Sequence, residues 1–430
     1  MAWSGVVVIC LTSLIGLPLT YSVNLFKDNV SNPLIILGIG GVALILVALL
    51  PYLYTRNTDI PKRDPYFYAW SLFAFACVVD LIIALENDRI IHSFMAFYLL
   101  EGEPYLKTTH GTFINYWDAV VHFSLYIYIL KQDSYNERYR KAGLYWVGSI
   151  TNSLLIILPA GLIGEYGVRW PILLNMPYLC IPVWMGYKFL TNAPQHQTQY
   201  KSDSDQRGSQ PIQQRPVDLM FIVVFTAAIG VHVLRASAVL GSPAELAKNY
   251  LQQYEPYLTD GVAFPKVQML LYLFYFVPYY VLVIFDLLYP SGQSWVVDWS
   301  LIMAGASGEG QFSFIGASIH PYTPAASQLP QGNNLLFWVI NGALFIVPHL
   351  YAYRCVTMPT KSEVSTVHNG RAVLELSDSQ DKELMYDKRD SSADITESRK
   401  YNLLSVLAKL FFDQSYPTLY MFGLGEPSRD

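Results

Sequence analysis

Apolar stretches long enough to cross a lipid bilayer recur along most of this chain, and they limit its fold more than any other feature. About 17–25 mostly apolar residues are enough for one helical span. Only helices and closed barrels satisfy their backbone hydrogen bonds in lipid, and the short alternating strands of a barrel are not seen. The chain is 53% hydrophobic and 14% charged, against about 25% charged in soluble domains. The sequence therefore predicts an all-α polytopic membrane protein.

Ten stretches are candidates for transmembrane helices. They are 6–26, 33–54, 66–86, 112–131, 143–163, 171–190, 217–240, 262–289, 296–318 and 333–357. The loops on one side of these spans carry 11 Lys and Arg residues in total, and the loops on the other side carry 5. Because cytosolic loops are enriched in Lys and Arg, we expect the first side, and with it both termini, to lie in the cytosol.

Two motifs occur twice, which predicts two tandem copies of one four-helix membrane domain. The tetrapeptide Glu-Pro-Tyr-Leu occupies 103–106 and recurs 152 residues later at 255–258. A second pattern, N-x6-P-x4-Y-[K/R], starts at Asn175 and again at Asn341. The expected parts are two leading helices in 1–54, a first domain in 65–190, a cytosolic linker in 191–216, a second domain in 217–357 and a cytosolic tail in 358–430.

The tail is polar and mixed in charge over 358–400, a composition typical of disorder. Residues 401–412 place five apolar side chains on one helical stripe, namely Leu403, Leu404, Leu407, Leu410 and Phe411. This stripe predicts either an amphipathic helix on the membrane surface or a segment that docks on the protein's own bundle. The sequence does not decide between the two.

Ionisable residues within spans are costly in lipid, so they usually face the interior of a bundle. In the first domain these residues are Asp80, Glu86, Asp118 and His122. Asp118 and His122 are four residues apart and share one helix face, which suits proton transfer. A buried structural pair that holds helices together is the more common explanation of such a pattern. We expect Asp80 and Asp118 to share one polar cavity, with His122 as the charge partner of Asp118.

The glutamates of the two tetrapeptides, Glu103 and Glu255, have two interpretations. Each precedes a proline, which fixes the turn, so the carboxylate could cap the following helix or close the mouth of a cavity. Capping is the simpler interpretation, and we favour it slightly.

The second domain carries its own polar residues within spans: His232, Arg235, Gln268, Glu309, Gln311 and His349. An arginine within a span needs an anionic partner, and the best candidate for Arg235 is Glu309. His349 lies near the expected cytosolic end, where a snorkelling or structural role is expected.

Several longer stretches resemble the transmembrane 6 superfamily, over about residues 1–357. They are Val79–Leu85, Glu101–Leu106, Tyr116–Asp118, Gly143–Trp146, Tyr254–Leu258, Phe264–Met269 and Pro348–Cys355. This resemblance implies two tandem EXPERA domains, a four-helix unit shared with the emopamil-binding sterol isomerase and the sigma-2 receptor. It also implies a multi-pass protein of the endoplasmic reticulum membrane. The endoplasmic reticulum–Golgi intermediate compartment or the lysosomal membrane are the alternatives.

The functions implied by the resemblance concern lipids. The family looks like a set of regulators that affect triglyceride secretion and lipid-droplet content, with a sterol or neutral lipid as ligand. Lipid-synthesis or lipoprotein-assembly proteins are further expected partners. The alternatives are a sterol Δ8–Δ7 isomerase that uses Asp80, Asp118 and His122, and a scaffold for other lipid enzymes.

A comparison with the isomerase argues against catalysis. That enzyme uses a His and a Glu four residues apart on one helix and a second Glu on the next helix. The matching positions here look like Asp80, Ala84 and Asp118 in the first domain and His232, Ala236 and Leu270 in the second. The isomerase's Asn and Trp on its last helix look like Asn341 and Phe345. Neither domain carries the full set for proton transfer.

The candidate ligand-binding residues are Asp80, Glu103, Asp118, His122, Asn175, Glu255 and Asn341. The four cysteines form no CxxC motif or Cys/His cluster, so we expect no metal site. We also expect no cofactor, and no feature suggests a nucleic-acid partner.

Overall fold

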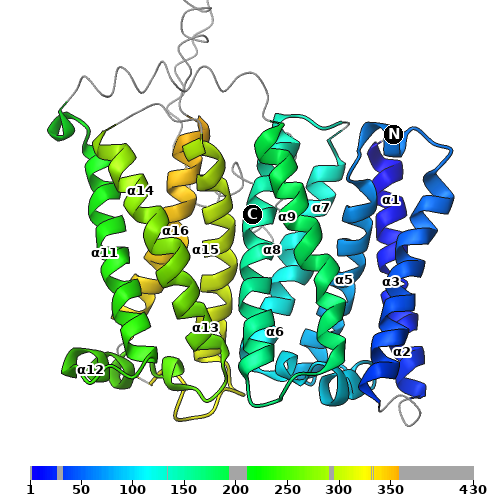
Figure 1. The fold of residues 1–430 in the computed structure, drawn as a ribbon, viewed down its shortest axis with the longest axis horizontal. Coiled ribbons are helices and arrows are strands. Elements are labelled where there is room, and N and C mark those ends of the chain that lie inside the picture. The colour runs from blue at the N-terminus through cyan, green and yellow to red at the C-terminus, as the bar shows by residue number, and fades with distance from the viewer. Residues whose placement is uncertain are drawn as a thin grey trace, which may run out of the picture. The chain divides into compact units, whose positions relative to one another are not determined.

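The computed structural model describes residues 2–26, 32–132, 134–192, 211–289, 295–330, 332 and 334–357. Across these residues the chain consists of helices and connecting loops, without a strand (Figure 1). Seven helical stretches are long and apolar enough to cross a membrane: Gly5–Leu25, Pro33–Thr55, Phe67–Asn87, Glu137–Ile163, Pro216–Val239, Phe264–Leu288 and Leu335–Thr357. The expected all-α polytopic membrane protein is confirmed.

The other three expected spans are also helical, although they are interrupted, shorter or more polar. The first is built from α6 (Thr109–Trp117), the π-helical turn η4 (Asp118–His122) and α7 (Phe123–Leu130). The second joins the 3-10 helix η5 (Trp170–Asn175) to α9 (Met176–Thr191). The third is α15 (Trp295–Ile319), which is buried along most of its length. Because neighbouring helices cover α15, its polar residues avoid lipid.

Local capping explains where several helices begin. Asn32 accepts a hydrogen bond from the Leu34 amide at the start of α3 (Pro33–Thr55), at 2.9 Å. Asn136 does the same for Tyr139 at the start of α8 (Glu137–Ile163), at 3.0 Å. These side chains satisfy backbone donors that have no partner within the helix.

Local structure recurs at the offset of the repeated tetrapeptide. Helix α5 (Phe67–Asn87) and helix α11 (Pro216–Val239) end 152 residues apart. The tetrapeptides then form matching 3-10 helices, η3 (Pro104–Lys107) and η8 (Pro256–Thr259). We call 65–190 repeat one and 217–357 repeat two; their assignment as EXPERA domains stays a prediction.

Each repeat also has a π-helical turn in its second helix. Asp118–His122 forms η4 in repeat one. Tyr272–Phe276 forms η9 in repeat two, between α13 (Phe264–Leu271) and α14 (Val277–Leu288). The counterpart of Asp118 is therefore Tyr272, and the expectation of Leu270 from ungapped alignment is corrected by two residues.

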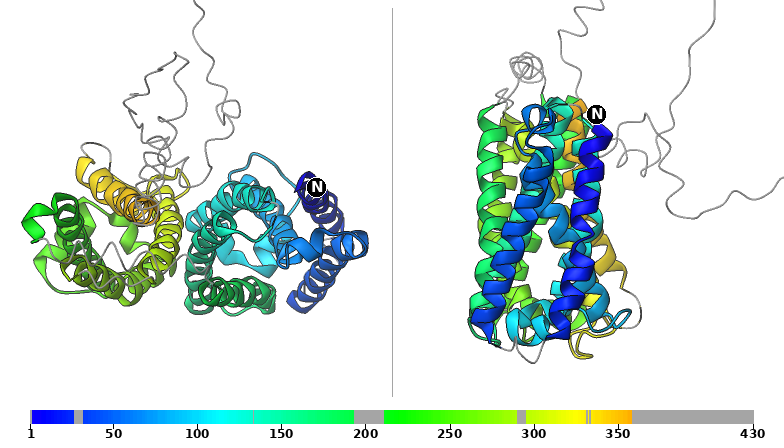
Figure 2. Two further views of the ribbon diagram at one scale, coloured as in Figure 1. Left: turned by 90° about the horizontal axis from the view of Figure 1, so that it is seen from above. Right: turned by 90° about the vertical axis from the view of Figure 1, so that its right-hand side faces the viewer.

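Repeat one and repeat two meet where α8 packs along α15 (Figures 1 and 2). Glycines allow this contact, because a Cβ atom on Gly148 would overlap the Ile302 carbonyl and one on Gly305 would overlap that of Tyr145. Small residues let membrane helices approach closely.

Polar pairs reinforce the contact between the repeats. The Arg140 guanidinium donates two hydrogen bonds to the Asp298 carboxylate, at 2.8 and 2.5 Å, and both side chains are buried. Toward the other end, the hydroxyl of Tyr257 and the Nδ1 atom of His110 are 3.2 Å apart. These bonds link residues more than 140 positions apart, so repeat one and repeat two form one packed unit.

The leading helices pack on repeat one. They are α1 (Ala2–Ser13), α2 (Gly16–Leu25) and α3, and all three contact α5. Helix α3 also contacts η5 and the π-helical turn η2 (Tyr98–Gly102). The last helix, α16 (Leu335–Thr357), completes repeat two. Most of the linker and the whole of 358–430, including the stripe at 401–412, lie outside the described residues.

Candidate functional site

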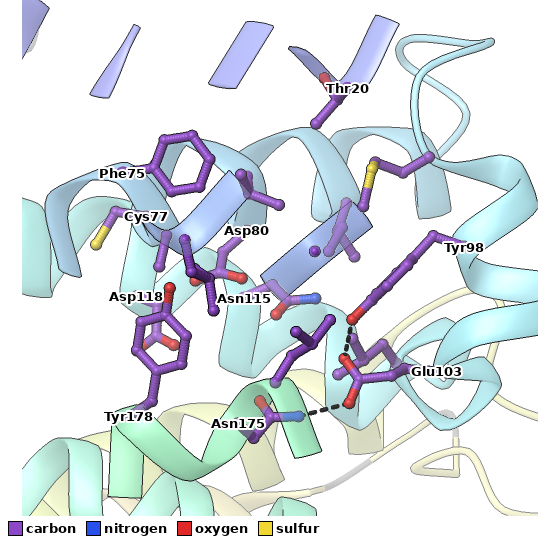
Figure 3. Close-up of a pocket in the computed structure, with 18 of the residues that line it drawn as sticks. Thr20, Phe75, Cys77, Asp80, Tyr98, Glu103, Asn115, Asp118, Asn175 and Tyr178 are labelled. Carbon is purple, nitrogen blue, oxygen red and sulfur yellow. Dashed lines mark hydrogen bonds between the residues drawn. The ribbon is translucent and has the colours of Figure 1, made fainter. Parts of the chain in front are cut away.

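A cavity of about 200 Å³ lies within repeat one. Its walls come from α5, η4, α8 and α9, and from the leading helices α2 and α3, which cover one side (Figure 3). Most of the lining is apolar, with Phe73, Phe75, Ile83, Leu154 and Ile157 among the side chains that contribute. An apolar cavity with a few converging polar groups is the usual form of a small-molecule site.

The predicted pair of carboxylates faces this cavity. Asp80 comes from α5 and Asp118 from η4, and both line it together with Asn115 (Figure 3). His122 lies behind them, with its Nδ1 atom 2.5 Å from Asp118 Oδ1. The Nε2 atom of His122 is 2.8 Å from the Ser149 hydroxyl on α8. The expectation of one shared cavity, with His122 as the partner of Asp118, is confirmed.

Glu103 lies at the end of the cavity nearest the interhelical loops. Its carboxylate accepts hydrogen bonds from Tyr98 and Asn175, both at 2.5 Å (Figure 3). It also accepts one from Tyr105. Burial raises the pKa of Glu103, and these three hydrogen bonds partly oppose that rise. The favoured interpretation of Glu103 and Glu255 as helix caps is wrong, because neither makes a side-chain cap hydrogen bond to its 3-10 helix.

The second motif explains why Asn175 reaches Glu103. Asn175 ends η5, which folds back toward the tetrapeptide of repeat one. The equivalent Asn341 on α16 donates to Glu255 at 3.0 Å. The two motifs that the sequence repeats thus meet in each half of the structure.

In repeat two the glutamate has a cationic partner. Arg235 on α11 donates to Glu255 through Nε at 2.8 Å and also through Nη2. It donates to Asn341 Oδ1 at 2.8 Å. The expected Arg235–Glu309 pair is wrong. Glu309 instead accepts from Asn152 at 2.5 Å and from Ser313 at 3.0 Å, so it belongs to the contact between the repeats.

Two further expectations concern residues outside the cavity lining. His349 does not snorkel: it is 1% exposed and its Nε2 atom is 3.1 Å from the Tyr145 hydroxyl, which fits the structural alternative. Glu86 accepts hydrogen bonds from the backbone amides of Ser93 and Met95 at 3.0 and 2.5 Å, so it orders the loop that follows α5.

Sequence reasoning missed several lining residues. Tyr98 could have been found, because Tyr250 occupies the equivalent position 152 residues later. Asn115 lies one turn before Asp118 on the same helix face, which is a weaker signal. Thr20 on α2 and Ala43 on α3 carry no motif, and only the packing of the leading helices places them at the cavity.

Comparison with known proteins decides the family. A human protein named "Transmembrane 6 superfamily member 2" is 40% identical over 350 residues, which cover 81% of this chain and 92% of the human protein. The chain belongs to the transmembrane 6 superfamily. The mouse protein of the same name is also 40% identical, over 351 residues, which cover 81% of this chain and 91% of that protein.

The family model described as "Transmembrane 6 superfamily member 2-like, transmembrane domain" matches residues 15–200. Every residue that lines the cavity falls inside this match, including those of α2 and α3. No solved structure matches the chain. The transmembrane 6 superfamily and the apolar helices together establish a multi-pass membrane protein.

Proposed function

We propose that this protein binds a sterol or another neutral lipid in the cavity of repeat one. We further propose that it acts in the endoplasmic reticulum membrane to regulate lipid secretion and storage. The observation that carries the proposal is the cavity itself, an apolar space between transmembrane helices with carboxylates and amides at one end. A lipid with a small polar head group and a large apolar body matches this combination of an apolar space and a few polar groups.

The size of the cavity limits how such a ligand is held. About 200 Å³ is below the range of about 300–1,000 Å³ typical of pockets that enclose a whole drug-sized molecule. We therefore expect the head group and the adjoining part of the ligand to occupy the cavity. The remainder extends past α2 and α3 toward the bilayer.

We propose binding without turnover. Acid–base catalysis on a double bond needs both a proton donor and a group that stabilises the cation. Asp118 and His122 form a close pair at 2.5 Å, and position 84 holds an alanine. The site therefore has acceptors that orient a head group and lacks the second acid of a sterol isomerase.

A pair of variants on one helix tests the proposal. Ala43 lines the cavity and its neighbour Val42 is 58% exposed on the outer face of α3. Radiolabelled cholesterol retained by the purified protein is the first measurement. We expect Ala43→Trp to weaken retention at least about 10-fold by filling the cavity, and Val42→Trp to retain the wild-type value.

The same variants connect binding to the cell. In cells depleted of the protein, Val42→Trp should restore lipid-droplet content and Ala43→Trp should not. Failure of the wild-type protein to retain cholesterol or diolein would overturn the binding proposal. Equal rescue by both variants would overturn the link between the cavity and lipid storage.

A further inference from the structure

Position 83 in repeat one and position 235 in repeat two are equivalent but carry different chemistry. They lie 152 residues apart, the same offset that relates the ends of α5 and α11 and the two tetrapeptides. Ile83 is an apolar residue in the cavity wall. Arg235 is a fully buried cation. The two repeats therefore differ at the position that decides what faces the glutamate.

In repeat two, the chain's own side chains occupy the interior. The Arg235 guanidinium donates to Glu255 and Asn341 and lies 5.1 Å from the centre of the Phe314 ring. Beside it, the His232 ring packs against Tyr272 with ring centroids 4.9 Å apart. His232 and Tyr272 stand where repeat one has the shorter Asp80 and Asp118. Larger side chains thus occupy the positions that line the cavity in repeat one.

In repeat one, the same acceptors lack an internal cation. Glu103 is held by neutral donors, among them Tyr98 and Asn175. His122 pairs with Asp118. Within the described part of the chain, no side chain donates a hydrogen bond to Asp80, which faces the cavity. The polar end of the cavity therefore offers hydrogen-bond acceptors to a ligand, and leaving a buried acceptor unpaired is unfavourable.

We infer that a free hydroxyl group of the ligand is the hydrogen-bond donor in repeat one. It occupies the place where the Arg235 guanidinium lies in repeat two. The inference rests on the proposed function and narrows its ligand class. A free sterol or a diacylglycerol has such a donor, whereas a steryl ester or a triacylglycerol has none. It also assigns one ligand to each chain, because repeat two is closed by its own arginine.

The sharpest test compares two sterols that differ by one methyl group. Cholesterol and cholesterol 3-methyl ether share the ring system and tail, but the ether cannot donate. We expect the purified full-length protein to retain cholesterol at one molecule per chain and the ether about 10-fold less tightly. Equal binding of the ether, or two cholesterol molecules per chain, would overturn the inference while leaving the proposed function in place. Failure to bind either sterol or diolein would overturn both.

A variant tests the equivalence of the two positions directly. Ile83→Arg should supply to Glu103 the cation that repeat two already has, and so abolish cholesterol retention. Ile83→Met, of similar length and without charge, should weaken cholesterol retention far less than Ile83→Arg does. The apparent unfolding temperature of both variants in detergent shows whether the fold survives. A folded Ile83→Arg protein that binds cholesterol as the wild type does would contradict the inference, and the ether comparison stands whatever this variant does.

Discussion

Asp118 contacts both the cavity and the polar side chains that lie between the helices of the bundle. Its carboxylate faces the cavity and lies 2.5 Å from His122 Nδ1, and His122 in turn lies against Ser149 of α8. We predict that Asp118→Asn weakens cholesterol retention about 10-fold with the fold intact, because the amide keeps the shape and loses the charged acceptor. Wild-type protein should show no Δ8–Δ7 isomerisation of a sterol.

Glu86→Gln is the matched control for Asp118→Asn. It neutralises a carboxylate on α5 that is not part of the cavity lining and that accepts hydrogen bonds from backbone amides of the following loop. It should leave cholesterol retention unchanged. Measured isomerisation by the wild type that disappears in Asp118→Asn would replace the binding function with an enzymatic one.

Asp64 gives the protein a pH-dependent stability. It lies just before α5, where burial raises its pKa to about 6 despite hydrogen bonds from the Tyr139 hydroxyl and the Tyr66 amide. The folded state binds this proton more tightly than the unfolded state does. The protonated Asp64 therefore contributes to the free energy of unfolding below about pH 4, and this contribution is lost as pH rises to about 6. We predict that Asp64→Asn removes this part of the pH dependence.

The measurement is the apparent unfolding temperature in detergent from pH 4 to pH 7. Asp59→Asn changes a carboxylate on the same loop whose side chain is 60% exposed, and it should follow the wild-type profile. A profile of Asp64→Asn that is parallel to the wild type would show that Asp64 does not titrate as described.

Single residues were predictable from the sequence when their partners lay nearby along one helix. Asp118 and His122 are four apart, so their contact follows from helix geometry. The partner of Arg235 was not predictable, because Glu255 and Glu309 are both distant from it in the sequence. Only the folding of the tetrapeptide loop back toward α11 brings Glu255 to Arg235. The role of Ile83 was invisible for a different reason, since an isoleucine in a span looks the same whether it faces lipid or a cavity.

Helix α8 is the element on which the contact between the repeats depends, and its glycine is a specific test. A Cβ atom on Gly148 would overlap the backbone of α15. We predict that Gly148→Ala destabilises the folded protein by about 1–3 kcal/mol, as overpacking does. Unfolding of the purified protein in mixed detergent micelles measures this change.

Gly230→Ala on α11 is the control for the glycine substitution. Its Cβ atom would meet no atom within 4 Å, so the substitution should be neutral or stabilise the helix by up to about 1 kcal/mol. Equal stability of the two variants would show that α8 and α15 are not in close contact.

The position of each membrane-spanning helix was predictable from the sequence, but the irregular turns within the helices were not. Apolar length predicted ten spans, and each of them is helical over most of its described residues. The π-helical turns at 118–122 and 272–276 have no apolar pattern of their own, because one inserted residue per turn leaves the hydrophobic content unchanged. Ungapped alignment chose Leu270 as the counterpart of Asp118 for a different reason. Four residues (260–263) separate η8 from α13, whereas Thr108 alone separates η3 from α6.

For the whole molecule, we predict that both termini and the linker lie in the cytosol. The basis is the distribution of 11 and 5 basic residues between the two sets of loops. A glycosylation acceptor inserted after Ser242 should be modified in cells, because this orientation puts that loop on the luminal side. One inserted at Ser204 should stay unmodified. The reverse pattern of modification would invert the orientation.

The recurrence of local structure could be anticipated from two short motifs, but the place of the leading helices beside the cavity could not. Residues 1–54 have no repeat partner, and α3 shows the exposed apolar face of any lipid-facing helix, with Val42 and Ile45 as examples. Its inner face lines the cavity only because η5 and α5 present complementary surfaces. Such complementarity depends on tertiary packing and leaves no periodic signal.

Helices α2 and α3 form one wall of the cavity, so a fragment of the chain needs them to contain the whole site. A fragment that begins at 65 would contain Asp80, Glu103 and Asp118, yet its cavity would be open to acyl chains along one side. Under the proposed function, the part of the chain that binds the ligand is therefore larger than repeat one. Among the described residues, α1, α2 and α3 pack on repeat one and have no counterpart beside repeat two, whose interior holds the buried side chains of His232, Arg235 and Tyr272.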